Sequence, residues 1–145
     1  MENSTVTSKS SKLKLDLKES KYATGRRKTS IAKVWLKKGS GKIYVNGKIY
    51  SDYFANDNHK MQITRPFEII NQPTEYDVRC SGKGGGPTGQ AGAMVHGISK
   101  ALVLFDENFK ISLKTEKLTT RDSRAVERKK PGRRKARRSF QFSKR

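Results

Sequence analysis

The last twenty-five residues, 121–145, constrain this chain most, because they contain very little that a core could bury. They hold twelve Lys and Arg against two acidic residues, a net charge of +10 in a chain whose total is +20. Their few apolar side chains are Ala125, Val126, Ala136, Phe140 and Phe142. So little apolar surface cannot offset the conformational entropy lost on folding. We therefore expect this segment, the basic tail, to become ordered only against a polyanion.

Composition divides the chain into three parts. Residues 1–20 are rich in Ser, Thr and Lys and are expected to form a disordered N-terminal extension. Residues 21–120 are enough for one globular body with a modest core, and residues 121–145 are expected to form a basic tail that binds RNA. The body is also basic, with seventeen Lys and Arg against eight acidic residues. A basic body joined to a basic tail predicts a nucleic-acid partner, because phosphate neutralisation with counterion release dominates such binding.

Other partners and chemistries find little support in the residues. Cys80 is the only cysteine and there are two histidines, so neither an intramolecular disulfide nor a Cys/His metal site is expected. No apolar run approaches the ~20 residues that span a bilayer, and the first twenty residues lack the apolar stretch of a signal peptide. No catalytic constellation can be placed from spacing, and His96 should satisfy a local hydrogen bond. We expect no enzyme activity, cofactor, small-molecule substrate or membrane partner.

Alternation of apolar and polar residues predicts strands at 30–37, 42–45 and 76–80. In the first of these, Ala32, Val34 and Leu36 form the apolar face. The Asn46-Gly47 pair is a strong hairpin signal that leaves a further short strand open. A turn into a helix starting near Ser51 is the favoured alternative.

The remaining segments are expected to be helices and loops. Residues 55–63 are polar and read as a loop, and Pro66 should open a short helix over 67–71. Apolar residues at three- and four-residue spacing predict a helix over 88–105, followed by a short helix within 106–118. A final helix, capped by Thr120 or Asp122, should stop at Pro131-Gly132.

Glycines are concentrated between the third predicted strand and the long helix. Gly84 to Gly89 formally fit the dinucleotide fingerprint G-x-G-x-x-G. We reject that reading, because Asp106 falls at the end of the same helix and not at the tip of a second strand. Backbone N–H groups of Gly84, Gly85 and Gly86 at a helix N-terminus could still hold an RNA phosphate. The alternative is a turn that binds nothing.

Two further features point to RNA. Arg26-Arg27-Lys28 lies just before the first predicted strand, and Lys83 could extend the same cationic surface. In the tail, Phe140 and Phe142 either stack on unpaired bases or anchor in a packed crevice, and the residues alone favour neither.

Four segments together resemble the ninth protein of the small ribosomal subunit, bacterial type. They are GRRKTSIAKVWL (25–36), GSGKIYVNG (39–47), GGGPTGQAGAMVHGISKAL (84–102) and TRDSRAVERKKPGRRKARRSFQFSKR (120–145). The resemblance covers residues 22–145, with the segments in order and at similar spacing.

The resemblance implies an α+β body: a four-stranded, mostly antiparallel sheet packed by helices, akin to the second domain of ribosomal protein five. A long, extended basic C-terminal tail would follow it. It also implies a place in the head of the small subunit, bound to small-subunit ribosomal RNA and to neighbouring head proteins. In this family the tail reaches toward the decoding centre, so Ser143, Lys144 and Arg145 would contact peptidyl-site transfer RNA. A cytoplasmic ribosome is the expected location, with an organellar ribosome as the alternative.

The chain is therefore expected to be a structural, RNA-binding constituent of the ribosome. The residues expected to bind ribosomal RNA are Arg26, Arg27, Lys28, Lys83, Gly84, Gly85, Gly86, Arg121, Arg124, Arg128, Lys129, Lys130, Arg133, Arg134, Lys135, Arg137 and Arg138. The alternative is a free, histone-like nucleic-acid-binding protein that uses the Lys- and Arg-rich tail as a non-specific arm. A phosphate-transferring enzyme built on the glycine-rich loop is a more distant third hypothesis.

Overall fold

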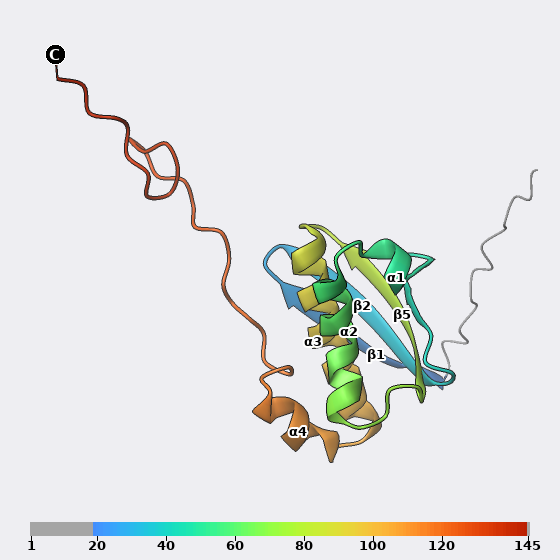
Figure 1. Ribbon diagram of the computed structural model, residues 1–145. Helices are drawn as coiled ribbons and strands as arrows, with labels where there is room; N and C mark the ends of the chain where they lie inside the picture. Colours follow the sequence, from blue (N-terminus) through green and yellow to red (C-terminus); the bar gives the residue numbers. More distant parts are fainter. Residues whose placement is uncertain (1–18, 145) are drawn as a thin grey trace, which may run out of the picture.

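The computed structural model describes residues 19–144, and a mixed five-stranded sheet in the order β1-β2-β5-β3-β4 forms its centre (Figure 1). The strands are β1 (Lys21–Arg27), β2 (Ser30–Lys38), β3 (Ile43–Val45), β4 (Lys48–Ile49) and β5 (Tyr76–Lys83). All neighbours are antiparallel except β3 and β5, which are parallel. The α+β class is confirmed, but the sheet has five strands where four were expected. Of the residues 1–20 that were expected to be disordered, 1–18 lie outside the described residues, as does Arg145 with its expected role.

Helices cover one face of this sheet. They are α1 (Tyr50–Tyr53), α2 (Asp57–Ile69), α3 (Pro87–Phe105) and α4 (Phe109–Thr115). Figure 1 shows α2 and α3 side by side on the same side of the sheet, with α4 below them. The long helix and the short helix after it confirm the expectations for 88–105 and for 106–118.

The core lies between β2 and α3. Ala32, Val34 and Leu36 are fully buried, as the alternation along this strand predicts. Met94 and Ile98 of α3 are fully buried as well. Each large apolar side chain removed from water in this way contributes roughly 1.5–3 kcal/mol. The apolar face of β2, where every second residue is buried, therefore packs on the apolar face of α3, where buried residues recur every three or four positions.

Strand β1 was not expected, and small residues explain why. Its buried face consists of Ala23 and Gly25, which carry little apolar signal. A Cβ atom at Gly25 would lie 1.8 Å from the carbonyl oxygen of Ala93 and 2.4 Å from the nitrogen of Gly97. The backbones of β1 and α3 are therefore in direct contact. Consequently Arg26 and Arg27 belong to a strand and do not precede one.

The Asn46-Gly47 pair forms a tight hairpin turn between β3 and β4. Both residues have positive φ, 49° and 83°, as a two-residue hairpin turn of this type requires. Helix α1 follows at once, so the hairpin and the helix, treated as alternatives, are both present. The Asn46 side chain also exchanges two hydrogen bonds of 3.0 Å with the backbone of Gly82, which ties the turn to β5.

Helix α2 replaces the loop expected at 55–63. It begins after Asn56, whose side chain accepts a hydrogen bond from the Asn58 backbone N–H at 3.0 Å. Pro66 lies inside this helix and does not open it. Ile63, Pro66 and Phe67 are buried against the core, and this packing outweighs the hydrogen bond that proline cannot donate.

Residues 116–144 contain neither helix nor strand, so the expected final helix is wrong. The chain leaves the body after α4 and runs away from it (Figure 1). Val126 is 90% exposed, and three successive cations follow at 128–130. Without a surface to pack on, like charges at this density do not support a helix. No helix within residues 19–144 is long and apolar enough to cross a membrane.

Candidate nucleic-acid interface

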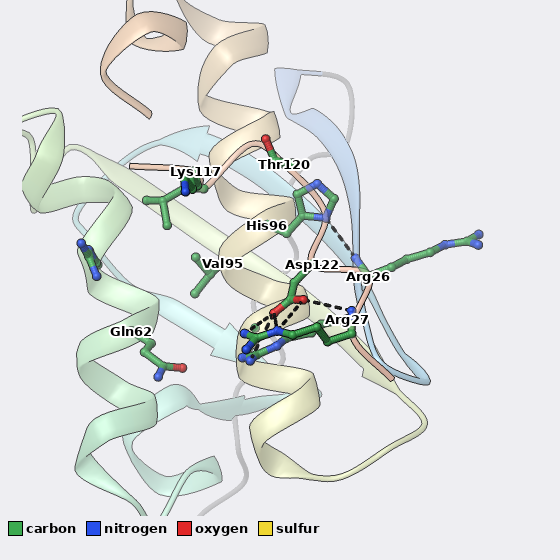
Figure 2. Close-up of a pocket in the computed structure, with 12 residues that line it drawn as sticks. Arg26, Arg27, Gln62, Val95, His96, Lys117, Thr120 and Asp122 are labelled. Atoms are coloured by element: carbon green, nitrogen blue, oxygen red, sulfur yellow. Dashed lines mark hydrogen bonds and ion pairs between the residues drawn. The ribbon is translucent and has the colours of Figure 1, made fainter. Parts of the chain in front are cut away.

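A cleft of about 380 Å³ lies where the tail leaves the body, between α2, α3 and the end of β1 (Figure 2). We call it the junction cleft. Its cationic lining side chains include Arg27, Arg65, Lys117 and Arg124. Arg65 is neutralised by Glu116 at 2.6 Å. The sequence does not single out Arg65 or Lys117, because Arg65 lies between the loop expected at 55–63 and the helix expected at 67–71, and only the fold brings these segments together.

Arg27 connects the body to the tail. Its side chain lies across Gly92 of α3, where an added Cβ would be 2.2 Å from the Arg27 Cδ atom. Its guanidinium nitrogen is 3.6 Å from an Asp122 carboxylate oxygen. The glycine at 92 thus leaves room for an arginine that reaches over the helix to the first residues of the tail.

Asp122 holds the start of the tail in a local turn. It accepts hydrogen bonds from the Arg124 backbone N–H at 3.0 Å and from the Arg124 Nη2 at 2.8 Å. These side-chain and backbone hydrogen bonds from Arg124, reinforced by the charges of Arg124 and Arg27, keep the pKa of Asp122 well below its ordinary value. Arg27 and Arg124, both expected to bind RNA, therefore share one ionised carboxylate, and Figure 2 shows Arg27 beside Asp122.

His96 joins the outer edge of β1 to the same junction. Its Nδ1 accepts a hydrogen bond from the Arg26 backbone N–H at 3.3 Å, and it also has a hydrogen bond with the backbone of Thr119. Burial lowers the pKa of His96, and the charges of Lys100 and Arg121 lower it further. The imidazole is therefore neutral near pH 7 and makes the local hydrogen bond that the sequence predicts.

Arg26 and Lys83 lie on a different side of the body from Arg27. The register aligns Arg26 with Ile31 and Ile31 with Lys83, so the three share one row of the sheet. Figure 2 shows the Arg26 side chain directed away from the junction cleft. Lys28 stands in the β1–β2 turn with φ of 52°. The basic triplet at 26–28 therefore spreads over two faces and a turn.

The glycine-rich loop packs against the β1–β2 turn. A Cβ at Gly85 would lie 2.1 Å from the Ser30 Oγ, and one at Gly84 would lie 2.9 Å from the Thr29 carbonyl oxygen. Ser30 also donates a hydrogen bond to the Gly84 carbonyl at 3.0 Å. Close contact with the protein therefore explains these two glycines. Gly86, the residue before α3, has open space where a Cβ would be.

Within the tail, Glu127 gathers residues on either side of Pro131. Its carboxylate pairs with Lys130 and with Arg137, the latter at 2.9 Å. The Arg134 backbone N–H donates to the Arg138 carbonyl at 2.8 Å, and Arg133 donates to the Arg137 carbonyl at 2.8 Å. Residues 127–138 thus form a small hydrogen-bonded loop in place of a fully extended strand.

Most tail cations have no acidic partner. In the described residues 19–144, the acidic side chains of the tail pair only with Arg27, Arg124, Lys130 and Arg137. The tail cations that form no ion pair within the same range are Arg121, Arg128, Lys129, Arg133, Arg134, Lys135, Arg138 and Lys144. This excess positive charge is available to an external anion.

The two tail phenylalanines are exposed, 62% for Phe140 and 87% for Phe142. The Arg134 guanidinium lies over the Phe140 ring, 6.0 Å from its centroid, and Phe140 lines a pocket of about 280 Å³ together with residues 129–133 of the tail. Ser143 and Lys144 end the described residues, far from the body in Figure 1. Within residues 19–144 no cluster of His, Cys, Asp and Glu could hold a metal ion.

A comparison with known protein families agrees with this cationic geometry. The family model described as ribosomal protein S9/S16 matches residues 25–145, which includes the end of β1, the glycine-rich loop, α3 and the whole basic tail. A structural role in the ribosome and binding to ribosomal RNA are properties of this family. The chain therefore belongs to the ribosomal protein S9/S16 family and is an RNA-binding constituent of the small ribosomal subunit.

Proposed function

We propose that this protein occupies the head of the small subunit, where its tail binds ribosomal RNA and its last residues contact peptidyl-site transfer RNA. Residues 121–138 form the ribosomal RNA contact, and Ser143, Lys144 and Arg145 form the transfer RNA contact. Neighbouring head proteins are the expected protein partners. The observation that carries the proposal is a run of cations without acidic partners on a segment that leaves the body.

Electrostatics and reach support this division of the tail. Each phosphate that a tail cation neutralises releases condensed counterions, which is favourable at physiological salt. Twenty-five residues extend to at most ~80 Å, so a body bound at the outside of a ribonucleoprotein particle could place its end deep inside. The loop at residues 127–138 shortens that reach in the free chain. Because weak surface ion pairs hold the loop, phosphates can replace its carboxylate and open it.

The body adds a second set of phosphate contacts in this proposal. Arg26, Lys28 and Lys83 project from the same end of the sheet, beside the loop of Gly84, Gly85 and Gly86. Arg27 contributes through the junction cleft, where it shares Asp122 with Arg124.

The ribosomal RNA contact can be tested by charge removal. The test is the slope of log binding constant against log salt concentration, measured with a head-domain RNA fragment. The triple change Arg128→Gln, Lys129→Gln, Arg133→Gln should make this slope shallower by about 0.7–0.9 for each phosphate contact that is lost. Lys110→Gln with Lys114→Gln, two exposed lysines on α4, is the control that should leave the slope unchanged. An equal loss from both sets would show that only net charge matters.

The transfer RNA contact needs the assembled particle. Ribosomes that carry a chain truncated after Phe142 should assemble normally but release peptidyl-site transfer RNA faster. Lys144→Arg, which keeps the charge, should behave like the unchanged protein. Unchanged dissociation from the truncated ribosomes would refute this part of the proposal. Stoichiometric sedimentation with small subunits at moderate salt is expected, whereas association with chromosomal DNA would instead support the histone-like alternative.

A further inference from the structure

The second face of the sheet, opposite α2 and α3, has no helix over it in residues 19–144 (Figure 1). Strand β2 defines the two faces: Ala32, Val34 and Leu36 are buried toward the helices, so Ile31, Lys33, Trp35 and Lys37 project to the other side. We call this side the open face. These four residues belong neither to the junction cleft nor to the basic tail.

The register places one row of large side chains straight across the open face. Tyr22 pairs with Trp35, Trp35 with Arg79, Arg79 with Tyr44, and Tyr44 with Ile49. The Tyr22 and Trp35 ring centroids are 5.3 Å apart with a tilt of 44°. Neighbouring strands are about 4.8 Å apart, so the row spans roughly 19 Å. Three aromatic rings, one guanidinium and the Ile49 side chain therefore form a stripe to which each of the five strands contributes one residue.

On one side of this stripe lie cations that form no ion pair within residues 19–144. The next two rows contain Thr24, Lys33 and Ser81, then Arg26, Ile31 and Lys83. On the other side of the stripe the charges are balanced: Glu19 pairs with Lys37 at 3.4 Å, and Asp77 accepts hydrogen bonds from the backbone N–H groups of Ser40 and Lys42. The positive charge of the open face is thus concentrated at the end nearest the glycine-rich loop.

We propose that the open face binds about two or three unpaired RNA nucleotides, stacked on Tyr22, Trp35 and Tyr44. Lys33, Arg26 and Lys83 then hold the phosphates that follow. Aromatic rings on a sheet beside unpaired cations are the combination that single-stranded nucleic acid requires, because bases stack and phosphates need counter-charge. A protein partner fits less well, because lysine is depleted at protein interfaces, and here Lys33 and Lys83 carry much of the charge beside the rings. This site rests on the proposed function in taking RNA as the partner.

The chain contains its own reporter for this site. Trp35 is the only tryptophan, so its emission reports stacking on the open face and not binding by the tail. Titration of the full chain with a single-stranded RNA dodecamer should quench Trp35 emission, while a duplex of equal length should bind with little quenching. The fluorescence anisotropy of labelled RNA follows total binding in parallel.

Substitutions on exposed positions separate stacking from charge. Tyr22→Ala should weaken the RNA binding that Trp35 reports by about fivefold or more, and Arg79→Gln should also weaken it. The matched controls are Ile111→Ala and Lys110→Gln on α4, which should stay within about twofold of the unchanged chain because neither residue lies on the sheet. Quenching by the duplex equal to that by the single strand would overturn the proposal.

A photo-crosslinking residue at position 22 in assembled small subunits identifies the molecule that contacts the open face in the ribosome. Crosslinks to ribosomal RNA support the proposal; crosslinks only to another protein, or only to residues 1–18 of this chain, overturn it. RNA that binds by anisotropy without any change in Trp35 emission also overturns the open-face site and leaves the tail function intact. If the unchanged chain bound no RNA at all, the result would instead contradict the proposed function itself.

Discussion

Replacing Gly25 by alanine should be one of the most damaging single-methyl changes in this fold. The added Cβ would lie 1.8 Å from the Ala93 carbonyl oxygen and 2.4 Å from the Gly97 nitrogen. These are backbone atoms in the middle of α3, and they cannot rotate aside. To restore an ordinary contact, β1 and α3 would have to separate by about 1.5 Å, and gaps of 0.5–1 Å already lose a quarter to a half of each dispersion contact.

The expected cost is at the upper end of the range for an overpacked core, about 3 kcal/mol. A domain of this size has only ~5–15 kcal/mol of stability. With a urea m-value of about 2 kcal/mol/M, the unfolding midpoint should fall by about 1.5 M. Trp35 emission provides the signal, since Trp35 lies on β2, which pairs directly with β1.

Gly86→Ala is the matched control. Position 86 has φ of −109° and nothing within 4 Å of an added Cβ, so the same methyl group should cost less than about 1 kcal/mol. A Gly25→Ala variant within about 1 kcal/mol of the unchanged chain would refute the direct contact between β1 and α3. A Gly86→Ala variant that loses as much as Gly25→Ala would show that glycine content, and not this contact, sets stability.

Three further predictions concern titration, thiol reactivity and tail charge. Burial lowers the pKa of His96 in the folded state. The stability that neutral His96 contributes is therefore full above its ordinary pKa of 6.5 and is lost as the pH falls below that value. The difference between the urea midpoints at about pH 7.5 and about pH 5.5 should be smaller for His96→Gln than for the unchanged chain. Burial raises the pKa of the Cys80 thiol to about 12, so a thiol reagent at about pH 8 should react only after unfolding, and rapid labelling of the folded chain would contradict this. Asp122→Asn removes the carboxylate shared by two arginines and should steepen the salt dependence of RNA binding by at most about one in log–log slope, whereas an unchanged slope would mean that the freed arginines make no phosphate contact.

The sheet and its long helix were predictable where apolar spacing was unambiguous. Ala32, Val34 and Leu36 alternate over β2, and Met94, Ile98 and Leu102 recur at helical spacing in α3, so burial on one face follows directly. Strand β1 was missed because its inward residues are Ala23 and Gly25. These small residues let the backbones of β1 and α3 come into contact, but they bury little apolar surface. Such a strand gives no alternation signal, although the glycines at 92 and 97 hint that something approaches α3 closely.

Helix α2 and the junction were harder to predict, for different reasons. Only Ile63, Pro66 and Phe67 of helix α2 are buried, so the amphipathic pattern of this helix is weak. In addition, Pro66 was expected at the first turn of a helix, whereas it lies inside α2. The tail sequence correctly indicates excess charge. It does not show that Asp122 pairs with Arg27, because a contact between residues so far apart depends on the fold. Arg26, Arg27, Lys28 and Lys83 were expected to share one cationic surface. The structure instead divides them between the open face, the β1–β2 turn and the junction cleft.

The outer edge of β1 has a consequence for the chain before it joins a particle. An exposed strand edge is a template on which another chain can add a strand, which leads to aggregation. Here the Thr24 carbonyl accepts a hydrogen bond from Lys100 at 3.2 Å, and the Arg26 N–H donates to His96. The opposite edge is β4, only two residues long. Two side chains and one very short strand thus leave an incoming strand fewer backbone groups to pair with, which disfavours aggregation through the edges of the sheet.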